Sequence, residues 1–502
     1  MIIIQNMVRI DKRLAEPVYL QLSNGIANVI QQGLLKPGTA LPSSRKLAEF
    51  FEIHRKTVIA AFDELQAMGW AESLPRKGLF VASTLPVPKA RSVVPVKPTT
   101  TYPEVTAYPL DNRQYSFDRP FTARKERLIF NDGFPDTRLA PMELLIREYR
   151  RFSNYRFTAK FLSYGPEQGS ENLRNELARF LNTTRGLNIT PANVLITKGG
   201  QMAMYLVSAL LLKKGDEVIV GEPGYLGASE VFRNAGANLN FVPVDADGLD
   251  IDAVEQICRK KKVRMLFVIP HHHTPTTVTL CASRRKQLLD VARKYQFAVI
   301  EDDYDFDFHY ASSPILPLTS VDTCGNVIYV GSFCKTVAPA IRIGFLVAPT
   351  NLVEQAAWLR KLVDRQGEQL MEEAMANLLR NGDIDRHLKK ANKIYHERRD
   401  LLCSLLASEL GGLVEFDVPA GGFAVWTRFG DRDLRLIWQQ AQKLGLGISD
   451  GIEYWHIKSN KINAVRLGFA SLNEKEMEEA VGLLKKAVVG AGKAAVSARP
   501  LV

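Results

Sequence analysis

Short apolar segments rich in β-branched residues alternate with helical segments along the chain from Phe130 onward. This alternation is typical of βαβ units, in which mostly parallel strands form a sheet covered by helices. One such segment, residues 327–330, reads Val-Ile-Tyr-Val and predicts a buried strand that ends at Gly331. Sheets of this kind bind ligands beyond the carboxyl ends of their strands. The residues that follow each predicted strand are therefore the candidates for a binding site.

An amine, a hydroxyl and a guanidinium follow the predicted strand 327–330. Lys335 can form an imine with an aldehyde, and Ser332 and Arg342 can bind a phosphate dianion. Pyridoxal 5′-phosphate carries both an aldehyde and a phosphate on one small molecule. The plainer alternative is a strand, a glycine turn and a surface lysine, because lysines are common at protein surfaces. The ends of the other predicted strands distinguish these alternatives.

A glycine-rich turn connects the predicted strand 193–197 to a helix. Its residues Gly199, Gly200 and Gln201 lie where the first backbone amides of a helix are open to an anion, so they predict a phosphate-binding turn. A glycine pair after a strand is often only a turn, so this motif alone is weak evidence. Tyr225 follows the next predicted strand and can stack on a planar ring, although a tyrosine there often belongs to the core.

Acidic residues follow the predicted strand 297–300. A carboxylate beside a pyridine nitrogen keeps that nitrogen protonated, and a phenol can hydrogen-bond the hydroxyl of the ring. Asp302 and Tyr304 are the candidates for these two roles. The alternatives are a helix cap or an aspartate-rich metal loop, but the segment 301–307 lacks the glycine spacing of a calcium loop.

Three consecutive histidines follow the predicted strand 265–269. Neighbouring side chains of an extended chain point to opposite sides, so only His271 and His273 can bind one metal ion. A zinc site needs a further ligand, and the sequence shows none that converges on this pair. We therefore predict a loop that lines the cofactor pocket, and no metal site.

Residues 17–82 have the pattern of a smaller domain with three helices and a β-hairpin. Apolar residues at helical spacing mark the helices, Ser43 or Ser44 caps the second one, and the hairpin turns at Lys77-Gly78. The predicted elements are helices from Val18 to Ile30, within 41–51 and over 54–68, and two strands within 74–81. This order is that of a winged helix-turn-helix.

In a winged helix-turn-helix the later helix enters the major groove of DNA with its first residues at the base edges. Arg55 can then read guanine, while Arg45, Lys56 and Lys77 contact the sugar-phosphate backbone. The formal net charge of +11 permits a polyanionic partner. The alternative is a solvated basic face on a winged helix that binds protein. The candidate DNA-binding residues are Ser43, Arg45, Arg55, Lys56, Thr57, Arg76 and Lys77.

Four short motifs of this domain resemble the GntR-type winged-helix domain. They are residues 17–21, 35–38, 41–45 and 55–58. The resemblance implies recognition of a double-stranded DNA operator through positions that include Arg45, Arg55 and Thr57. Two positions depart from the family pattern: Glu52 replaces a small residue or glycine in the turn, and Ile59 replaces a residue that is commonly basic.

Prolines recur among serine, threonine and lysine between residues 83 and 124. Such a composition predicts an extended, semi-stiff linker. The predicted segments are thus a winged helix-turn-helix domain (1–82), a Pro-rich linker (83–124), a large α/β domain (125–490) and a C-terminal tail (491–502). Five cysteines without a CxxC pair favour the reducing cytoplasm, and no signal peptide or membrane-spanning segment is expected.

The strand-end motifs of the large domain occur in one order: phosphate turn, aromatic, pocket loop, carboxylate, lysine and arginine. This succession, from about Arg127 to Val489, resembles the class I/II aminotransferases of fold type I. The matching motifs are residues 164–169, 197–201, 222–225, 301–304, 332–335 and 465–469. The resemblance implies a mixed, mostly parallel sheet with a smaller C-terminal α+β subdomain.

The same resemblance implies a role for each candidate residue. Lys335 would form the internal aldimine with pyridoxal 5′-phosphate, Asp302 would bind the pyridine nitrogen, and Tyr304 the phenolic oxygen. Arg466 would bind a substrate carboxylate, for which a planar guanidinium is suited. The phosphate would be held by Ser332, Arg342 and the amides of Gly200 and Gln201, joined by Tyr164 of a second subunit.

Three positions depart from the aminotransferase pattern. Residues 273–277 read His-Thr-Pro-Thr-Thr where the family has Asn-Pro-Thr-Gly or Gln-Phe-Pro-Thr-Gly, Cys334 replaces a serine, and Lys198 replaces a small residue. The residues that hold the ring are thus intact while the substrate-side loop is altered. This combination favours holding the cofactor over fast turnover.

From end to end the chain resembles the MocR/GabR-type regulators, in which a GntR-type winged helix is joined to an aminotransferase-like domain. The resemblance implies a cytoplasmic, homodimeric transcription factor that binds pyridoxal phosphate and a small amino compound as effector. Two alternatives remain: an active aminotransferase that carries a winged helix, and a cofactor-free dimerisation domain joined to a DNA-binding domain.

Overall fold

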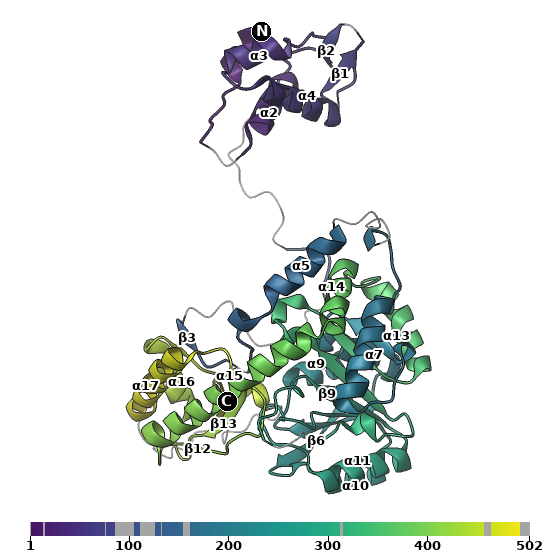
Figure 1. Cartoon of the computed structure of the whole chain (residues 1–502), viewed down its shortest axis with the longest axis vertical. Coiled ribbons are helices and arrows are strands. Elements are labelled where there is room, and N and C mark those ends of the chain that lie inside the picture. The colour runs from purple at the N-terminus through teal and green to yellow at the C-terminus, as the bar shows by residue number, and fades with distance from the viewer. Residues whose placement is uncertain are drawn as a thin grey trace. The chain divides into compact units, whose positions relative to one another are not determined.

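The computed structural model describes residues 2–13, 16–75, 77–85, 105–110, 126–131, 133–153, 161–311, 315–455 and 463–491. The chain divides into two compact units, residues 1–112 and 113–502 (Figure 1). The division falls within the predicted linker 83–124, most of which lies outside the described residues, as does most of the predicted tail 491–502. The boundaries of the four predicted segments therefore stay predictions.

The first unit has the predicted three helices and hairpin. Its elements are α2 (Val18–Gln31), α3 (Ser44–Phe50), α4 (Arg55–Ala67), β1 (Ala71–Leu74) and β2 (Gly78–Val81). The strands pair antiparallel, and Leu22, Leu47 and Val58 bring the three helices together in one core. Ser43, rather than Ser44, caps α3 by accepting a hydrogen bond of 3.4 Å from the amide of Lys46.

The hairpin begins earlier than predicted. Its first strand starts at Ala71 rather than Leu74, and a hydrogen bond of 3.0 Å from the amide of Lys77 to the carbonyl of Leu74 closes the turn. Only Ala71 is buried in this strand, so apolar alternation does not mark it in the sequence. Arg76 lies outside the described residues.

A further helix, α1 (Ile2–Met7), packs on α2 and was not predicted. Ile4 and Val8 are buried in the same core as the three other helices. Gly25 in the middle of α2 makes room for them, because a Cβ at this position would lie 2.7 Å from Cγ1 of Val8. The glycine therefore lowers the stability of α2 somewhat, but it lets the first residues of the chain pack closer to this helix.

The turn between α3 and α4 contains Glu52 at a φ of +50°, in the left-handed region that favours glycine. This conformation explains why a glycine suits the position. Two hydrogen bonds hold the turn: the amide of Ile53 donates to the carbonyl of Ala48 at 3.0 Å, and the side-chain Nζ of Lys12 donates to the carbonyl of Glu52 at 2.9 Å.

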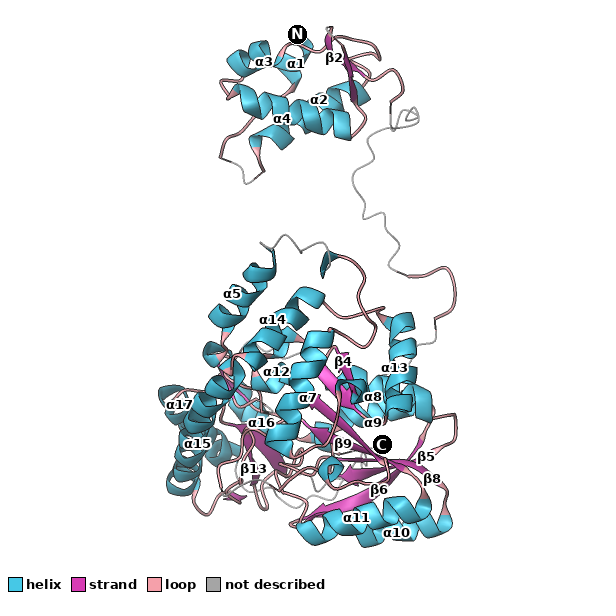
Figure 2. Cartoon of the chain, turned by 45° about the vertical axis from the view of Figure 1, so that its right-hand side comes forward, coloured by secondary structure: helices cyan, strands magenta, loops and turns pink. Residues whose placement is uncertain are grey.

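The second unit is built on an eight-stranded sheet (Figure 2). In spatial order its strands are β4 (Val194–Thr197), β11 (Gly344–Val347), β10 (Val327–Ser332), β9 (Ala298–Asp303), β8 (Val263–Val268), β5 (Glu217–Glu222), β6 (Asn238–Asp245) and β7 (Gly248–Leu249). Neighbours from β10 to β6 are parallel, whereas β11 is antiparallel to both its neighbours and β7 is antiparallel to β6. The predicted mixed, mostly parallel sheet is confirmed.

Helices cover both faces of this sheet. Because side chains of a strand alternate between faces, Val218 and Val220 of β5 pack with α8 (Gly200–Leu211) and α9 (Leu226–Asn234). Ile219, between them, packs with α10 (Ile251–Lys260) and α11 (Ala282–Tyr295) on the other face. The remaining large helices of this part are α5 (Met142–Ser153), α7 (Glu171–Arg185), α13 (Thr350–Val363) and α14 (Gln369–Arg380).

The C-terminal part of the unit forms the predicted smaller α+β subdomain. Its antiparallel sheet has the order β12 (Glu415–Phe416), β13 (Ala424–Arg428) and β15 (Ala464–Gly468). The helices packed with it are α15 (Asp383–Leu410), α16 (Leu434–Lys443) and α17 (Glu474–Ala491). β3 (Leu128–Ile129) pairs with β14 (Leu446–Gly447), so the residues that follow the predicted linker join this subdomain. Among the residues described, none of the helices combines the length and the apolarity needed to cross a membrane.

Replacing Glu52 by glycine is expected to stabilise the first unit by about 0.5–1 kcal/mol, because it removes left-handed strain and keeps the backbone hydrogen bonds. Native-state hydrogen exchange of the α4 amides measures the change. Glu49→Gly is the control, because Glu49 lies inside α3, where glycine destabilises by about 0.5–1 kcal/mol. Faster exchange in Glu52→Gly than in the parent protein would contradict the argument.

Candidate functional site

A cavity of about 550 Å³ opens where β9 and β10 end. Eight of the residues predicted for the cofactor line it: Gly200, Gln201, Tyr225, Asp302, Tyr304, Ser332, Lys335 and Arg342. Further lining residues were not predicted, among them Phe134, Met204, Glu453 and Tyr454. The sequence gives little warning of these, because they come from helices and loops without a strand-end motif.

Lys335 lies on α12 (Phe333–Thr336), the short helix that follows β10. The hydroxyl of Ser332 begins this helix by accepting a hydrogen bond of 3.0 Å from the amide of Cys334. Nζ of Lys335 donates to the carbonyl of Gly133 at 3.0 Å and lies 3.9 Å from the ring centre of Phe134. The amine at the cavity wall therefore contacts a segment that is distant in sequence.

One part of the cavity collects groups that suit a phosphate. Arg342 has a φ of +54°, and its Nη2 donates to the carbonyl of Lys198 at 2.7 Å. Gly199 permits this approach, because a Cβ there would lie 2.8 Å from the same nitrogen. Gly200 begins α8, whose first amides have no acceptor within the helix. With the hydroxyl of Ser332, these amides and the guanidinium are the donor set of a phosphate site.

Asp302 is buried in β9, opposite Val330 of β10. Burial, with the charges of Asp303 and Asp305, raises the pKa of Asp302 to about 7, although Lys335 opposes the shift. The expectation that Asp302 follows the strand was wrong, because backbone pairing with β10 continues to Asp303. A carboxyl with this pKa can share a proton near neutral pH, as the partner of a ring nitrogen must.

Tyr304, Thr274 and Arg466 form one hydrogen-bonded group. The hydroxyl of Tyr304 donates to the carbonyl of His272 at 2.9 Å and lies 2.9 Å from the hydroxyl of Thr274. Burial raises the pKa of Tyr304 above its ordinary value, so the side chain stays a phenol. Nη1 of Arg466 donates to Thr274 at 2.8 Å, but Arg466 is buried and does not line the cavity. A ligand carboxylate reaches this guanidinium only if its neighbours move.

The predicted pocket loop, residues 273–277, contributes Thr274 to the cavity. Thr277 stands where the aminotransferase pattern has glycine, and its φ of +61° is the left-handed conformation that glycine adopts without strain. Burial and the charge of Arg466 lower the pKa of His273 to about 3, so the ring is neutral. Its Nδ1 is hydrogen-bonded to the hydroxyl of Thr276 at 2.9 Å.

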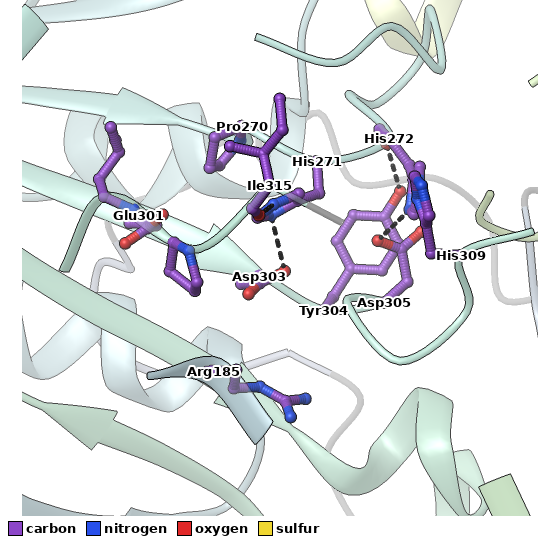
Figure 3. Close-up of polar contacts among 12 residues, drawn as sticks. Arg185, Pro270, His271, His272, Glu301, Asp303, Tyr304, Asp305, His309 and Ile315 are labelled. Atoms are coloured by element: carbon purple, nitrogen blue, oxygen red, sulfur yellow. Dashed lines mark hydrogen bonds and ion pairs between the residues drawn. The ribbon is translucent and has the colours of Figure 1, made fainter. Parts of the chain in front are cut away.

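The acidic segment 301–307 binds partners of its own beside the cavity (Figure 3). Nδ1 of His271 lies 3.4 Å from Asp303, and Nδ1 of His272 lies 3.0 Å from Asp305. The histidines and carboxylates are thus engaged in separate pairs. In the part of the chain that the structure describes, no three His, Cys, Asp or Glu side chains converge as a metal site.

Two further predicted residues lie away from the cavity wall. Gly199 stands behind it, against Arg342. Tyr164 is 73% exposed at the surface of the second unit, with the guanidinium carbon of Arg365 lying 3.9 Å from its ring centre. Tyr164 does not line the cavity of its own chain, so its role in the site of a second subunit stays a prediction.

The candidate DNA-binding side chains gather at the first turns of α3 and α4 and at the hairpin. The exposed members are Ser43, Arg45, Arg55, Lys56 and Lys77, while Thr57 is half-buried. Nε of Arg55, the first residue of α4, donates to the hydroxyl of Ser44 at 3.2 Å. This bond links the amino-terminal ends of the two helices.

The raised pKa of Asp302 makes the stability of the cofactor-free protein depend on pH. The unfolded chain releases this proton near the ordinary pKa of 3.8 and the folded chain near 7, so the folded state loses stability as the pH rises between these values. Asp302→Asn cannot ionise. Its unfolding temperature, relative to the parent protein, is expected to rise from mildly acidic to mildly alkaline pH, and thermal unfolding measures it. A difference that does not change with pH would contradict the raised pKa.

Both units match known families. Residues 18–81 match the bacterial regulatory proteins of the gntR family, and residues 146–484 match aminotransferase class I and II. The probable rhizopine catabolism regulatory protein MocR of Rhizobium meliloti is 28% identical, over 96% of this chain and 96% of its own length. YisV of Bacillus subtilis (strain 168), an HTH-type transcriptional regulator, is 30% identical, over 82% of this chain and 84% of its own length.

A solved structure matches the second unit. LysN, alpha-aminoadipate aminotransferase from Thermus thermophilus in complex with N-(5′-phosphopyridoxyl)-L-leucine, has a TM-score of 0.68 at 26% identity, covering 72% of this chain and 92% of that one. The aminotransferase match spans more than half of this chain, and the two regulators match across both of its domains. The chain therefore belongs to the MocR/GabR-type regulators, in which a GntR-type helix-turn-helix domain is fused to a class I and II aminotransferase domain of fold type I.

Proposed function

We propose that this regulator binds pyridoxal 5′-phosphate through Lys335, senses a small amino compound at the same site, and controls transcription at a double-stranded DNA operator. One observation carries the proposal: a single cavity joins Lys335, Asp302 and the phosphate donors in a chain that also has a GntR-type domain. When bound, pyridoxal 5′-phosphate supplies an aldehyde that condenses reversibly with primary amines. Lys335 and an effector amine therefore compete for one carbon atom.

The cavity residues have separate tasks in this proposal. Asp302 shares a proton with the pyridine nitrogen, because its pKa of about 7 allows exchange near neutral pH. Tyr304 donates a hydrogen bond to the ring oxygen in place of its bond to the carbonyl of His272, and Tyr225 stacks on the ring. The phosphate is held by Ser332, Arg342 and the amides at the start of α8, which belong to Gly200 and Gln201.

The effector in this proposal is an amine that carries a carboxylate or a similar anionic group. Arg466 binds that group once Thr274 gives up its hydrogen bond to the guanidinium. The LysN complex supports the class of ligand, since in that protein a leucine is joined to the phosphopyridoxyl group. The pocket loop, with Thr274 in place of an amide, favours holding such a ligand over turning it over.

The DNA-binding part of the proposal depends on α4. Its first residues, Arg55 and Lys56, are exposed, as is Lys77 of the hairpin. These positive side chains lie where a winged helix meets base edges and phosphates. In this proposal the regulator acts in the cytoplasm with the chromosomal DNA, and five cysteines without a CxxC pair agree with that reducing compartment.

A homodimer completes the proposal. Apolar side chains are strongly exposed in the second unit: Leu162, Tyr164, Trp358 and Leu362 are exposed by 71%, 73%, 64% and 84%. Trp358 and Leu362 lie four residues apart, on one face of α13 (Thr350–Val363). Exposed apolar side chains gathered in this way are typical of a protein interface. Tyr164 is one of these exposed side chains, which agrees with the role predicted for it in the site of a second subunit.

Leu362→Glu is expected to weaken this dimer at least about tenfold, because it buries a charge in an apolar interface. Sedimentation velocity across a range of concentrations measures the dissociation. Val418→Glu is the matched control, since Val418 is 59% exposed but lies in the smaller subdomain. A Leu362→Glu variant as dimeric as the control would place the interface elsewhere.

The two activities separate in a pair of variants. Lys335→Ala is expected to lose the visible imine absorbance while keeping its affinity for the operator. Arg55→Ala is expected to lose about 1–3 kcal/mol of operator affinity while keeping the absorbance. Absorbance titration and gel shift are the two measurements.

An active aminotransferase is distinguished by turnover. Parent protein with an amino acid and a keto acid is expected to show slow transamination or none, whereas turnover at ordinary enzymatic rates would favour the enzyme. An operator shift that Arg55→Ala leaves unchanged would contradict the assigned groove contact.

A further inference from the structure

The segment Gly133–Phe134, named the strap, holds the amine of Lys335 from two sides. Nζ of Lys335 donates to the carbonyl of Gly133 at 3.0 Å and lies 3.9 Å from the ring centre of Phe134. Both contacts are those of an ammonium group, since the carbonyl accepts one of its hydrogens and the ring attracts its charge. The strap is therefore held by the same nitrogen that would form the imine with the cofactor.

The strap is also tied to the smaller subdomain. The side-chain amide of Asn131, just before the strap, donates to the hydroxyl of Ser471 at 2.6 Å. A Cβ on Gly468 of β15 would lie 2.3 Å from the carbonyl oxygen of Asn131, so the two backbones are in close contact. Gly133 has a φ of +75°, and a Cβ on it would lie 2.9 Å from Nη2 of Arg466. The strap thus joins Lys335 to the strand that carries Arg466.

The position of the strap in the chain connects it to the predicted linker. It follows β3, the first strand after the predicted linker 83–124. β3 pairs with β14, and Leu128 and Phe130 are buried in the core of the second unit, so the strap is continuous with the anchored start of this unit. How firmly the strap is held therefore affects the stretch from which the linker leads to the DNA-binding domain. No contact between the two units is needed for this coupling.

We propose that the strap reads the chemical state of Lys335, a regulation that rests on the cofactor function proposed above. When Lys335 condenses with an aldehyde, a C=N bond replaces the C=O bond, and the oxygen leaves as water with two of the three hydrogens of the ammonium. The nitrogen keeps at most one hydrogen, and its contacts with the strap are lost.

An effector amine reverses this change. It forms the C=N bond to the same carbon while the bond to Lys335 breaks, and Lys335 takes up the hydrogens that the effector amine gives up. The recovered ammonium binds Gly133 and Phe134 again. The strap is therefore loosely held when the cofactor alone is bound, and firmly held when cofactor and effector are bound together. The exchange of the bond at Lys335 thereby changes how firmly the chain is held at the end of the predicted linker.

Hydrogen exchange of the full-length protein tests the strap with two ligands that differ at the reacting carbon. Pyridoxal 5′-phosphate can bond to Lys335, whereas pyridoxamine 5′-phosphate carries an amine there and cannot. Exchange at the amides of residues 128–134 is expected to be about tenfold faster with the aldehyde, because a charged hydrogen bond and a cation–π contact are lost. In Lys335→Ala the two ligands are expected to give equal exchange.

Substitutions of the ring provide the matched controls. Phe134→Leu removes the attraction to the ammonium and is expected to reduce the difference between the ligands. Phe134→Tyr keeps a ring and is expected to retain it. Peptides from β13, whose residues pair within the smaller subdomain, serve as the internal reference and should not respond.

Visible absorbance measured on the same samples separates this inference from the proposed function. Absorbance with the aldehyde but equal exchange under both ligands overturns the strap and leaves the cofactor function intact. A difference that persists in Lys335→Ala overturns it too, because the response then does not depend on the amine. No absorbance overturns the cofactor function, and the strap with it.

Discussion

The parallel pairing of β9 with β10 aligns the side chains of the cofactor cavity in the larger unit. Its register sets Asp302 opposite Val330, and Lys335 follows β10 on the next short helix. The carboxyl and the amine thereby line one cavity, where the positive charge of Lys335 opposes the rise in the pKa of Asp302. A slip of one residue in either strand would turn the carboxyl to the opposite face of the sheet.

Adjacent carboxyls on β9 show how burial alone does not decide protonation. Burial opposes the ionisation of Asp303, yet His271, Arg185 and Tyr329 hold the pKa of this carboxyl below its usual range. Asp302, one residue earlier, faces the cavity instead, and its pKa is raised to about 7. Two neighbouring aspartates thus differ in protonation: Asp303 stays ionised, whereas Asp302, which lines the cavity, can gain or lose a proton near neutral pH.

The sequence predicts the features that short stretches encode by themselves. Strand ends, the glycine turn and the acidic segment could be placed without the fold, because each combines a local pattern with a general rule about where sheets bind ligands. Phe134 and Tyr454 could not be placed, since the pairing of β3 with β14 and the packing of the smaller subdomain bring them in from both ends of the unit.

The sequence also could not show which of the predicted side chains are accessible to a ligand. A motif gives the identity of Arg466 but not its burial behind Thr274 and the backbone at Gly133. The first helix, α1, was not predicted for a different reason: residues 2–7 are too short an apolar run to show a helical period. Its place in the core depends on Gly25, a contact that no local pattern reveals.

The pairing of β3 with β14 also orders events during synthesis. The DNA-binding domain is complete early, and domains made first generally fold first. The second unit cannot complete its fold until the ribosome has released Leu446–Gly447 and, after them, the strand that bears Arg466. The DNA-binding domain of each new molecule is therefore folded for an interval before the cofactor cavity of the second unit is complete.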